Sequence, residues 1–255
     1  MKEEVSERAC REQAAYDSSR VHEHSARLQS RFAHIFSGPN SLAAESFFAG
    51  RLTAWAPGAD VLDYGCYTGE LEEVLLPLSP RSVVGIDISS KAIGDARRKR
   101  RPQCEYHVMD ASRTTFPDSS FDLVVGRAIL HHLDFEPSLR EVHRLLRPGG
   151  HALFVEPLRG NPVAKVIRTL TPRARTSDEA PLTRTQVRLG DNIFGSGEHF
   201  FANLLSVPAG VISSLLARTP DNPAMRAADS ADRALARTSL RYWMRLVVLA
   251  WELRN

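Results

Sequence analysis

The stretch that decides the fold is VLDYGCYTGE, residues 61–70. A short apolar run ends in an acidic residue, and two glycines, Gly65 and Gly69, follow with three residues between them. Gly65 permits a tight turn, and Gly69 lets the next helix begin close to a bound group. This pattern is typical of the first strand, loop and helix of an open α/β sheet, where ligands bind beyond the carboxyl ends of the strands.

The same unit repeats along the chain, because further short apolar runs are each followed by a helical pattern. They lie at residues 82–88, 105–109, 121–126 and 152–156. Strands that alternate with helices form a parallel sheet with both faces covered. The sequence therefore predicts an α/β fold with a doubly wound, mostly parallel sheet.

The glycine spacing and two aspartates indicate the type of ligand. A dinucleotide fingerprint needs G-x-G-x-x-G, which this loop lacks, and the chain has no Walker loop. Asp87 lies 22 positions after Gly65, at the end of the second predicted strand, where a carboxylate can accept both hydroxyls of a ribose. Asp110 follows the third predicted strand, where it can accept a hydrogen bond from an exocyclic amine.

Five segments together resemble the class I S-adenosylmethionine-dependent methyltransferases, specifically the small-molecule, ubiquinone/menaquinone-type (methyltransferase type 11) group. They are VLDYGCYTGE (61–70), VVGIDIS (83–89), VMDA (108–111), FDLVVGRAILHHL (121–133) and LLRPGGHALFVEP (145–157). Each segment alone is a weak signal, but all five follow the order and spacing of the family. The resemblance implies a Rossmann-like sheet of seven strands, an amino-terminal helical cap, a lid after strand five and S-adenosylmethionine as cofactor.

The resemblance also implies which residues bind the cofactor. Asp63 would orient the glycine loop and the cofactor's amino group, and the loop would approach the methionine moiety. Asp87 would bind the ribose, and Arg127 would sit beside the methionine or sulfonium. The full implied set is Tyr16, Asp63, Gly65, Cys66, Gly69, Asp87, Ile88, Asp110, Ala111, Arg127 and Ala128.

Tyr67 departs from the family pattern, which usually has glycine at this position. One interpretation is a tolerated loop variant whose side chain points away from the cofactor. The alternative is a weakened cofactor site.

The catalytic candidates are His131, His132 and Glu156. A hydroxyl acceptor must lose a proton during methylation, and histidine is the usual base at neutral pH. His131 follows the fourth predicted strand and Glu156 ends the fifth, so a carboxylate could fix the tautomer of the imidazole and stabilise its charged form. The alternative is that the paired histidines only pack around the cofactor, as in relatives that need no base.

The chain divides by pattern into a helical cap (1–56), a cofactor-binding core (57–157) and a carboxyl-terminal segment (158–255) with the lid and the final strands. Residues 171–198 are polar and rich in Pro, Gly and Arg, which is typical of a functional lid. The cap and the lid would enclose the methyl acceptor.

Composition excludes several classes of protein. The chain has 255 residues, a net charge of +3 and three cysteines, so neither a nucleic-acid partner, a disulfide framework nor a metal site is indicated. The longest uncharged apolar-rich run, 207–217, is too short to span a membrane, and the amino terminus has no signal-peptide pattern. We expect a cytoplasmic protein, and a homodimer is compatible with the sequence.

The leading functional prediction is S-adenosylmethionine-dependent methylation of a small molecule, at oxygen, in bacterial secondary metabolism. A C- or N-methyltransferase that acts on a small molecule or a quinone precursor is the first alternative. A protein that binds the cofactor without transferring a methyl group is the second.

Overall fold

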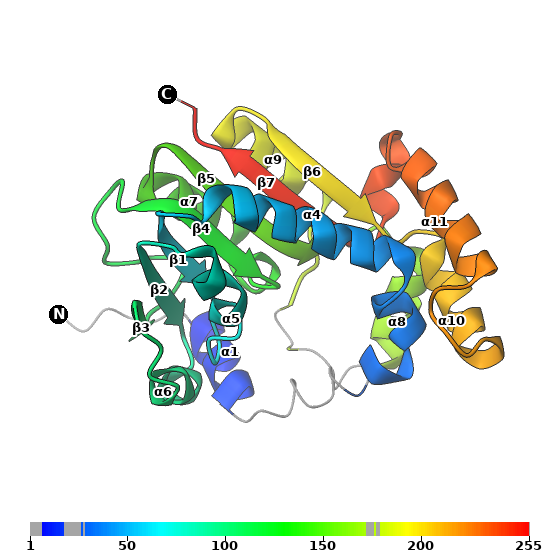
Figure 1. Cartoon of the computed structure of the whole chain (residues 1–255), viewed down its shortest axis with the longest axis horizontal. Helices are drawn as coiled ribbons and strands as arrows, with labels where there is room; N and C mark the ends of the chain where they lie inside the picture. Colours follow the sequence, from blue (N-terminus) through cyan, green and yellow to red (C-terminus); the bar gives the residue numbers. More distant parts are fainter. Residues whose placement is uncertain (1–6, 18–26, 28, 172–175, 177–178, 255) are drawn as a thin grey trace.

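The computed structural model describes residues 7–17, 27, 29–171, 176 and 179–254. One seven-stranded sheet runs through the molecule, in the order β3-β2-β1-β4-β5-β7-β6 (Figure 1). The chain crosses over at β1, so β1 and β4 are adjacent and the loops that follow them lie at one edge. Such a switch point is where open α/β sheets bind ligands.

The five strands predicted from the apolar runs are present and parallel to one another. They are β1 (Asp60–Tyr64), β2 (Ser82–Asp87), β3 (Cys104–Val108), β4 (Phe121–Arg127) and β5 (Leu146–Pro157). β7 (Leu246–Glu252) is antiparallel to β5, and β6 (Gly197–Ala202) is antiparallel to β7. The predicted seven-stranded, mostly parallel sheet is therefore confirmed.

One face of the sheet is covered by α4 (Pro39–Trp55) and α5 (Glu72–Leu75), which η1 (Leu76–Leu78) extends. Phe48 and Leu52 of α4 are buried against strand residues of this face. α6 (Ser90–Arg98) packs on β2 and β3, and its first turn is capped by the Ser89 side chain, which accepts a hydrogen bond from Ala92 N.

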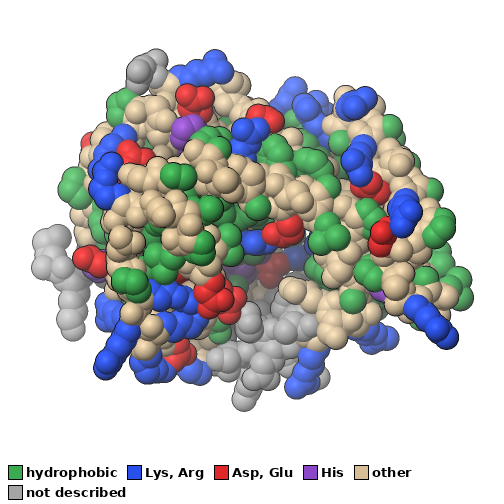
Figure 2. Space-filling model, in the orientation of Figure 1, with side chains coloured by type: hydrophobic (Ala, Val, Ile, Leu, Met, Phe, Trp, Pro, Cys, Tyr) green, Lys and Arg blue, Asp and Glu red, His purple; other side chains and the backbone are tan. Residues whose placement is uncertain are grey.

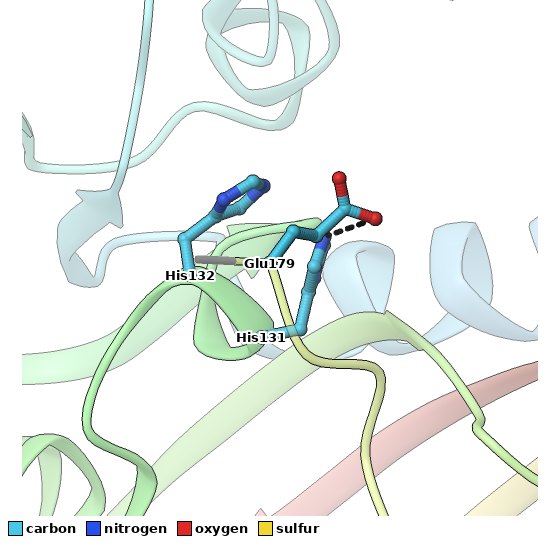
Figure 3. A group of neighbouring side chains, drawn as sticks. All are labelled: His131, His132 and Glu179. Carbon is cyan, nitrogen blue, oxygen red and sulfur yellow. Dashed lines mark ion pairs between the residues drawn. The ribbon is translucent and has the colours of Figure 1, made fainter. Parts of the chain in front are cut away.

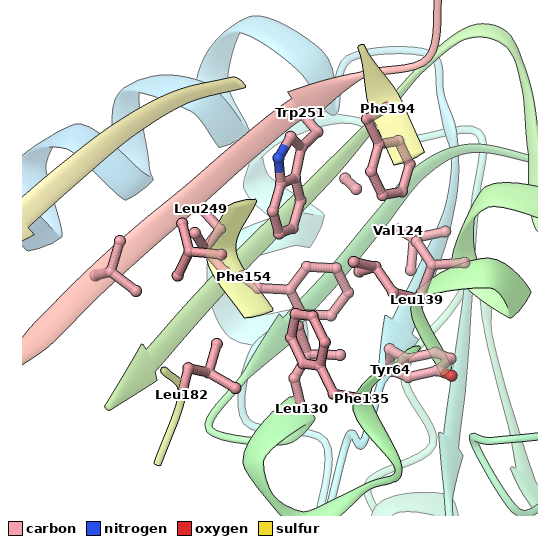
Figure 4. Packing of buried hydrophobic residues seen from close by; sticks show 14 of the residues in the cluster. Tyr64, Val124, Leu130, Phe135, Leu139, Phe154, Leu182, Phe194, Leu249 and Trp251 are labelled. Carbon is pink, nitrogen blue, oxygen red and sulfur yellow. The ribbon is translucent and has the colours of Figure 1, made fainter. Parts of the chain in front are cut away.

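The opposite face is covered by α7 (Phe135–Leu145) and α9 (Arg184–Phe194). Figure 4 shows the packing of this core, in which the rings of Phe194 and Trp251 stack with their centroids 5.2 Å apart. Gly190 lies directly against this indole, because an added Cβ would approach it to 2.4 Å. α9 therefore needs a glycine at that position in order to pack on the sheet.

The segment predicted as a polar lid, residues 171–198, is more ordered than the sequence indicated. It contains all of α9, whose Val187 and Phe194 are buried, and the start of β6. A capping box between Thr183 and Gln186 begins α9. The apolar positions of α9 are spaced for one helix face, and β6 is a partly buried edge strand with polar residues, so neither looked like core. Among the described residues of this segment, those before Thr183 belong to no helix or named strand.

A group of helices lies beside the carboxyl edge of the strands: α3 (Ala33–Phe36), α8 (Pro162–Leu170), α10 (Ser206–Leu216) and α11 (Pro223–Leu235). η4 (Ser239–Trp243) connects it to β7, and α1 (Glu7–Asp17) contacts α6. Figure 2 shows the surface hollowed between this group and the sheet, with acidic, basic and histidine side chains inside. Among the described residues, no helix has both the length and the apolar character needed to cross a membrane.

Candidate active site

The glycine loop after β1 has the geometry that its sequence predicted. Gly65 and Gly69 both adopt the left-handed conformation, with φ of 82° and 74°. The N–H groups of Gly65 and Cys66 donate to the carbonyl of Ile86, each at 2.9 Å, which holds the loop against β2. A Cβ on Gly65 would come within 2.7 Å of the Ile129 side chain, so no larger residue fits between β1 and the loop after β4.

Asp87 is held at the end of β2 by two backbone donors. Its carboxylate accepts hydrogen bonds from Tyr67 N and Ser89 N, both at 2.8 Å. Burial nevertheless raises the pKa of Asp87, since the desolvation of the carboxylate outweighs these bonds. The two bonds fix the orientation of the carboxylate, and each oxygen retains capacity for a ribose hydroxyl.

Tyr67 takes the backbone conformation of the glycine that it replaces, with φ of 47°. Its ring meets the ring of Tyr16 edge to face, with centroids 6.1 Å apart. The side chain is thus directed to Tyr16 of α1.

Two carboxyl groups are buried beneath the glycine loop, those of Asp63 and Glu72. Within the described residues, neither Asp63 Oδ2 nor either Glu72 oxygen has a hydrogen-bond partner. Burial, reinforced by Glu72, raises the pKa of Asp63; burial also raises the pKa of Glu72, although Arg101 Nη1 lies 3.9 Å away. An unsatisfied buried carboxylate at this point fits the cationic amino group of S-adenosylmethionine.

The residues implied for the adenine lie where β2 and β3 end. Asp110 Oδ1 accepts a hydrogen bond from Ser112 N at 2.8 Å. The carbonyl of Ala111 accepts from Tyr64 Oη, and that of Ile88 accepts from Gln13 Nε2 of α1. The structure thus brings Ile88, Asp110 and Ala111 to the same edge as the glycine loop, and α1 closes over it.

Arg127 and Ala128 lie where β4 ends. The Arg127 guanidinium forms an ion pair with Glu45 and packs over the Phe48 ring at 4.9 Å, so its end is directed to α4. Ala128 has φ of 56° and donates its N–H to the carbonyl of Val155. This strained turn changes the chain direction just before the two histidines.

His131 and Glu156 meet at the junction of β4 and β5. His131 lies in η2 (Leu130–His132), and its Nδ1 is 2.6 Å from Glu156 Oε2. Glu156 also accepts hydrogen bonds from Ile129 N at 3.0 Å and Leu130 N at 2.8 Å. The carboxylate therefore positions both the turn and the ring. With the Nδ1 proton donated to Glu156, the lone pair of His131 is on Nε2.

His132 belongs to a different set of contacts. Its Nε2 is 3.0 Å from Tyr16 Oη, and its Nδ1 is 3.1 Å from Glu12 Oε2. Thr176 donates to Glu12 Oε1 at 2.7 Å. Both ring nitrogens of His132 are engaged, so this residue joins α1 to the loop after β4. Burial, assisted by Glu12, raises the pKa of Tyr16, which keeps its hydroxyl a neutral hydrogen-bonding group.

Glu179 completes the surroundings of His131, as Figure 3 shows. Its Oε1 lies 3.8 Å from His131 Nε2 and accepts a hydrogen bond from Arg168 Nη1 at 2.5 Å. The neighbouring Ala180 N donates to the carbonyl of His131 at 2.9 Å. No sequence pattern pointed to Glu179 or Glu12, because both come from loops or caps whose path depends on tertiary contacts.

The ligand atoms of His131, His132 and Glu179 lie within 4.8 Å of one another, close enough to be considered for a metal ion. However, Arg168 already neutralises Glu179, and Tyr16 and Glu12 occupy His132. The arrangement is better suited to proton transfer at His131 Nε2 than to holding a cation.

Comparison with known proteins agrees with this geometry. Residues 62–154 match the family model of a methyltransferase domain. The demethylmenaquinone methyltransferase of Chlorobaculum parvum is 35% identical over 107 residues, which are 41% of this chain and 44% of that protein. The phosphoethanolamine N-methyltransferase of Triticum aestivum is 33% identical over 102 residues, 38% of this chain and 20% of that protein. The matched part thus spans less than half of either relative.

Solved structures resemble the fold over most of the chain. A methyltransferase of Haloferax volcanii, solved with the Trm112 methyltransferase activator, has a TM-score of 0.64 and 15% identity, covering 94% of this chain and 98% of that one. Geranyl diphosphate methyltransferase in complex with geranyl diphosphate and sinefungin has a TM-score of 0.56 and 15% identity, covering 82% and 77%. These structures share the fold of this chain, and the family match shows that residues 62–154 form a methyltransferase domain of the type 11 group.

Proposed function

We propose that this protein transfers a methyl group from S-adenosylmethionine to a hydroxyl of a small-molecule acceptor, with His131 as the general base. The observation that carries the proposal is the 2.6 Å contact between His131 Nδ1 and Glu156 Oε2. It lies where β4 and β5 end, next to the glycine loop after β1. A buried carboxylate that holds one imidazole nitrogen leaves the other free to take a proton.

When bound, S-adenosylmethionine supplies a methyl group activated by its sulfonium. Asp87 and Asp63 bind and orient the cofactor through its ribose and amino group. His131 Nε2 accepts the hydroxyl proton as the O–CH₃ bond forms and the S–CH₃ bond breaks. Glu156 would remain hydrogen-bonded to the Nδ1 proton and stabilise the resulting imidazolium, while Glu179 stays paired with Arg168.

The site residues also account for the exclusion of water. α1 lies over the glycine loop through Gln13, Tyr16 and Asp17, whose carboxylate accepts from Ser89 Oγ. The segment from Glu179 to Leu182 is attached from the other side by backbone hydrogen bonds to His131 and Pro157. Closure of a site in this way aligns donor and acceptor and protects the reaction from solvent.

The methylated atom distinguishes this proposal from its main alternative, transfer to carbon or nitrogen. The relatives that match this domain include a demethylmenaquinone methyltransferase and a phosphoethanolamine N-methyltransferase. The domain match alone therefore does not favour oxygen as the methylated atom. The buried dyad does, because a carbon or nitrogen nucleophile that is already electron-rich needs no such base. We place the reaction in bacterial secondary metabolism, in the cytoplasm, on the sequence considerations given above.

The test is a labelled-methyl assay with a metabolite extract, followed by mass spectrometry of the product. We expect label in an ether or ester oxygen position, and loss of that label with His131→Ala. His107→Ala serves as the matched control, because this histidine is a partly exposed residue of the edge strand β3. Label on carbon or nitrogen, or undiminished label with His131→Ala, contradicts the proposal.

A further inference from the structure

Arg245 is a partly buried cation that has no anionic partner among the residues that the structure describes. Its Nε is fully shielded and makes no hydrogen bond within the described part of the chain. No ion pair joins its guanidinium to a described carboxylate, and the group instead lies over the Phe36 ring, 4.8 Å from the centroid. Burial lowers the pKa of Arg245 to about 10, and no described acidic group raises it again.

Two buried aspartates of the neighbouring helix α11 have charged or polar partners, unlike the Arg245 guanidinium. Asp232, in α11, accepts hydrogen bonds from Asn40 Nδ2, Leu205 N and Ser206 Oγ at 2.6–3.1 Å. Asp229 of the same helix forms an ion pair with Arg233. A guanidinium nitrogen that is shielded from water and makes no hydrogen bond is unfavourable, and an anion beside the guanidinium would offset this cost.

The backbone of Arg245 lies at the same edge of the sheet as the catalytic candidates. Its carbonyl accepts a hydrogen bond from Leu158 N at 2.8 Å, and the next residue, Leu246, pairs with Pro157. Arg245 is therefore the diagonal neighbour of Glu156 across the β5–β7 pair, a separation of about 7–8 Å in such ladders. An acceptor with its hydroxyl at His131 could reach this residue with another part of the same molecule.

We propose that Arg245 binds an oxyanion of the methyl acceptor, a carboxylate or a phosphate. The planar guanidinium matches both groups with two parallel hydrogen bonds, and its charge would be neutralised on binding. The Phe36 ring beneath it accommodates an apolar part of the same ligand. This inference rests on the proposed function for the identity of the occupant; the anion site itself can be tested without methyl transfer.

The first experiment titrates the protein with inorganic phosphate and, separately, with acetate at constant ionic strength, with calorimetry and thermal unfolding as readouts. We expect saturable binding of at least one anion. Arg245→Gln should weaken it about tenfold or more, and Arg245→Lys less, because the charge remains but the paired geometry is lost. Arg218→Gln is the matched control, an exposed arginine just after α10. Far-ultraviolet dichroism and S-adenosylmethionine binding show that each variant is folded.

Two results overturn the anion site: no saturable binding of either anion, or equal binding by the wild type and Arg245→Gln.

The second experiment separates this inference from the proposed function. A metabolite extract is divided by anion-exchange resin before labelling, and we expect label in the retained fraction. If label is found only in the unretained fraction, the acceptor is not an oxyanion and this inference is wrong, although the proposed methyl transfer is supported. If phosphatase treatment of the extract removes the label, the anion is a phosphate; if it does not, a carboxylate. Absence of S-adenosylmethionine binding would overturn the proposed function, and the phosphate titration would still decide the role of Arg245.

Discussion

At the scale of single residues, the candidate site depends on a few carboxylates, each held for a different purpose. Glu156 is fully shielded from solvent and accepts hydrogen bonds from the turn and from His131. Asp87 is fixed by two backbone N–H groups. Because each carboxylate is oriented by the backbone, single substitutions can separate cofactor binding from proton transfer.

Substitution of His131 tests the base. We expect His131→Ala to reduce turnover by about 10²–10⁴-fold with little change in cofactor affinity, because only proton removal is lost. Glu156→Gln should lose less, since an amide still orients the ring but does not stabilise its charge. The measurements are initial rates with labelled cofactor and calorimetry with S-adenosylhomocysteine. If His132→Ala is inactive and His131→Ala is not, the base is His132; near-normal turnover of both indicates catalysis by alignment alone.

Substitution of Asp87 tests the ribose contact. Asp87→Ala should weaken binding of S-adenosylmethionine by about 1–3 kcal/mol, because two charge-assisted hydrogen bonds are lost. Asp95→Asn is a suitable control, since this aspartate lies in the following helix, α6, and pairs with Arg98 on the surface. Equal affinities of the Asp87→Ala variant and the wild type, by calorimetry, would place the ribose elsewhere.

At the scale of elements, the parallel strands were predictable, and the paths of the loops and caps over their carboxyl ends were not. β1, β2, β4 and β5 are largely buried apolar runs, and β3 is a more exposed edge strand. The carboxyl ends of parallel strands meet at one edge, so the meeting of His131 with Glu156 followed from the topology. The contacts of Glu12, Glu179 and Arg245 depend on how caps and loops fold back over that edge. No local pattern specifies such long-range contacts, and α9 was hidden by its many polar residues.

The start of α9 gives a stability prediction. The Thr183 side chain caps the helix by accepting from Gln186 N, and Gln186 Oε1 accepts from Thr183 N at 2.9 Å. Thr183→Ala should lower the free energy of unfolding by about 1 kcal/mol. Thr185→Ala, an exposed position two residues later, should change it by less than about 0.5 kcal/mol. Denaturant unfolding of both variants compares them, and equal values would mean that the box contributes nothing.

The connection before α9 gives a prediction of exchange rates. Ala180 N and Leu182 N are bonded to the carbonyls of His131 and Pro157, both at 2.9 Å, so this segment is attached to the turn that carries the base. Ligand binding beside that turn should slow hydrogen exchange at 179–183, whereas the core helix α7 should be unaffected. Mass spectrometry with and without S-adenosylhomocysteine measures this. Identical exchange in the two states would exclude coupling between the cofactor and the segment.

At the scale of the whole molecule, two carboxyl groups are buried beneath the glycine loop, at the edge where the parallel strands end, and their burial costs free energy of folding when they are ionised. Asp63 and Glu72 are buried together, and burial raises the pKa of each above its ordinary value of 3.8 or 4.5. Asp63 is 2% exposed and Glu72 is fully shielded, so water relieves neither. Burying two carboxyl groups together lowers the stability of the folded chain at neutral pH, and a cationic ligand beside Asp63 would offset part of this cost.

The sign of the pH dependence follows from these shifts. Well below the ordinary pKa values of 3.8 and 4.5, both carboxyl groups are protonated in the folded and the unfolded chain, and they contribute no difference. As the pH rises above the ordinary values, the unfolded chain releases protons that the folded chain retains, so the free energy of unfolding falls until the raised pKa values are passed.

Asp63→Asn should reduce this fall and weaken binding of S-adenosylmethionine by about 1–3 kcal/mol, since the amide cannot pair with the cofactor's ammonium. Glu105→Gln, whose side chain is 77% exposed, should do neither. Denaturant unfolding at pH 5 and pH 8 gives the stability difference. Calorimetry of cofactor binding in buffers of different ionisation enthalpy should detect a proton released as the cation approaches Asp63. A pH dependence of unfolding equal to that of the wild type in Asp63→Asn, together with unchanged affinity, would show that the buried carboxylate serves packing and not the ligand.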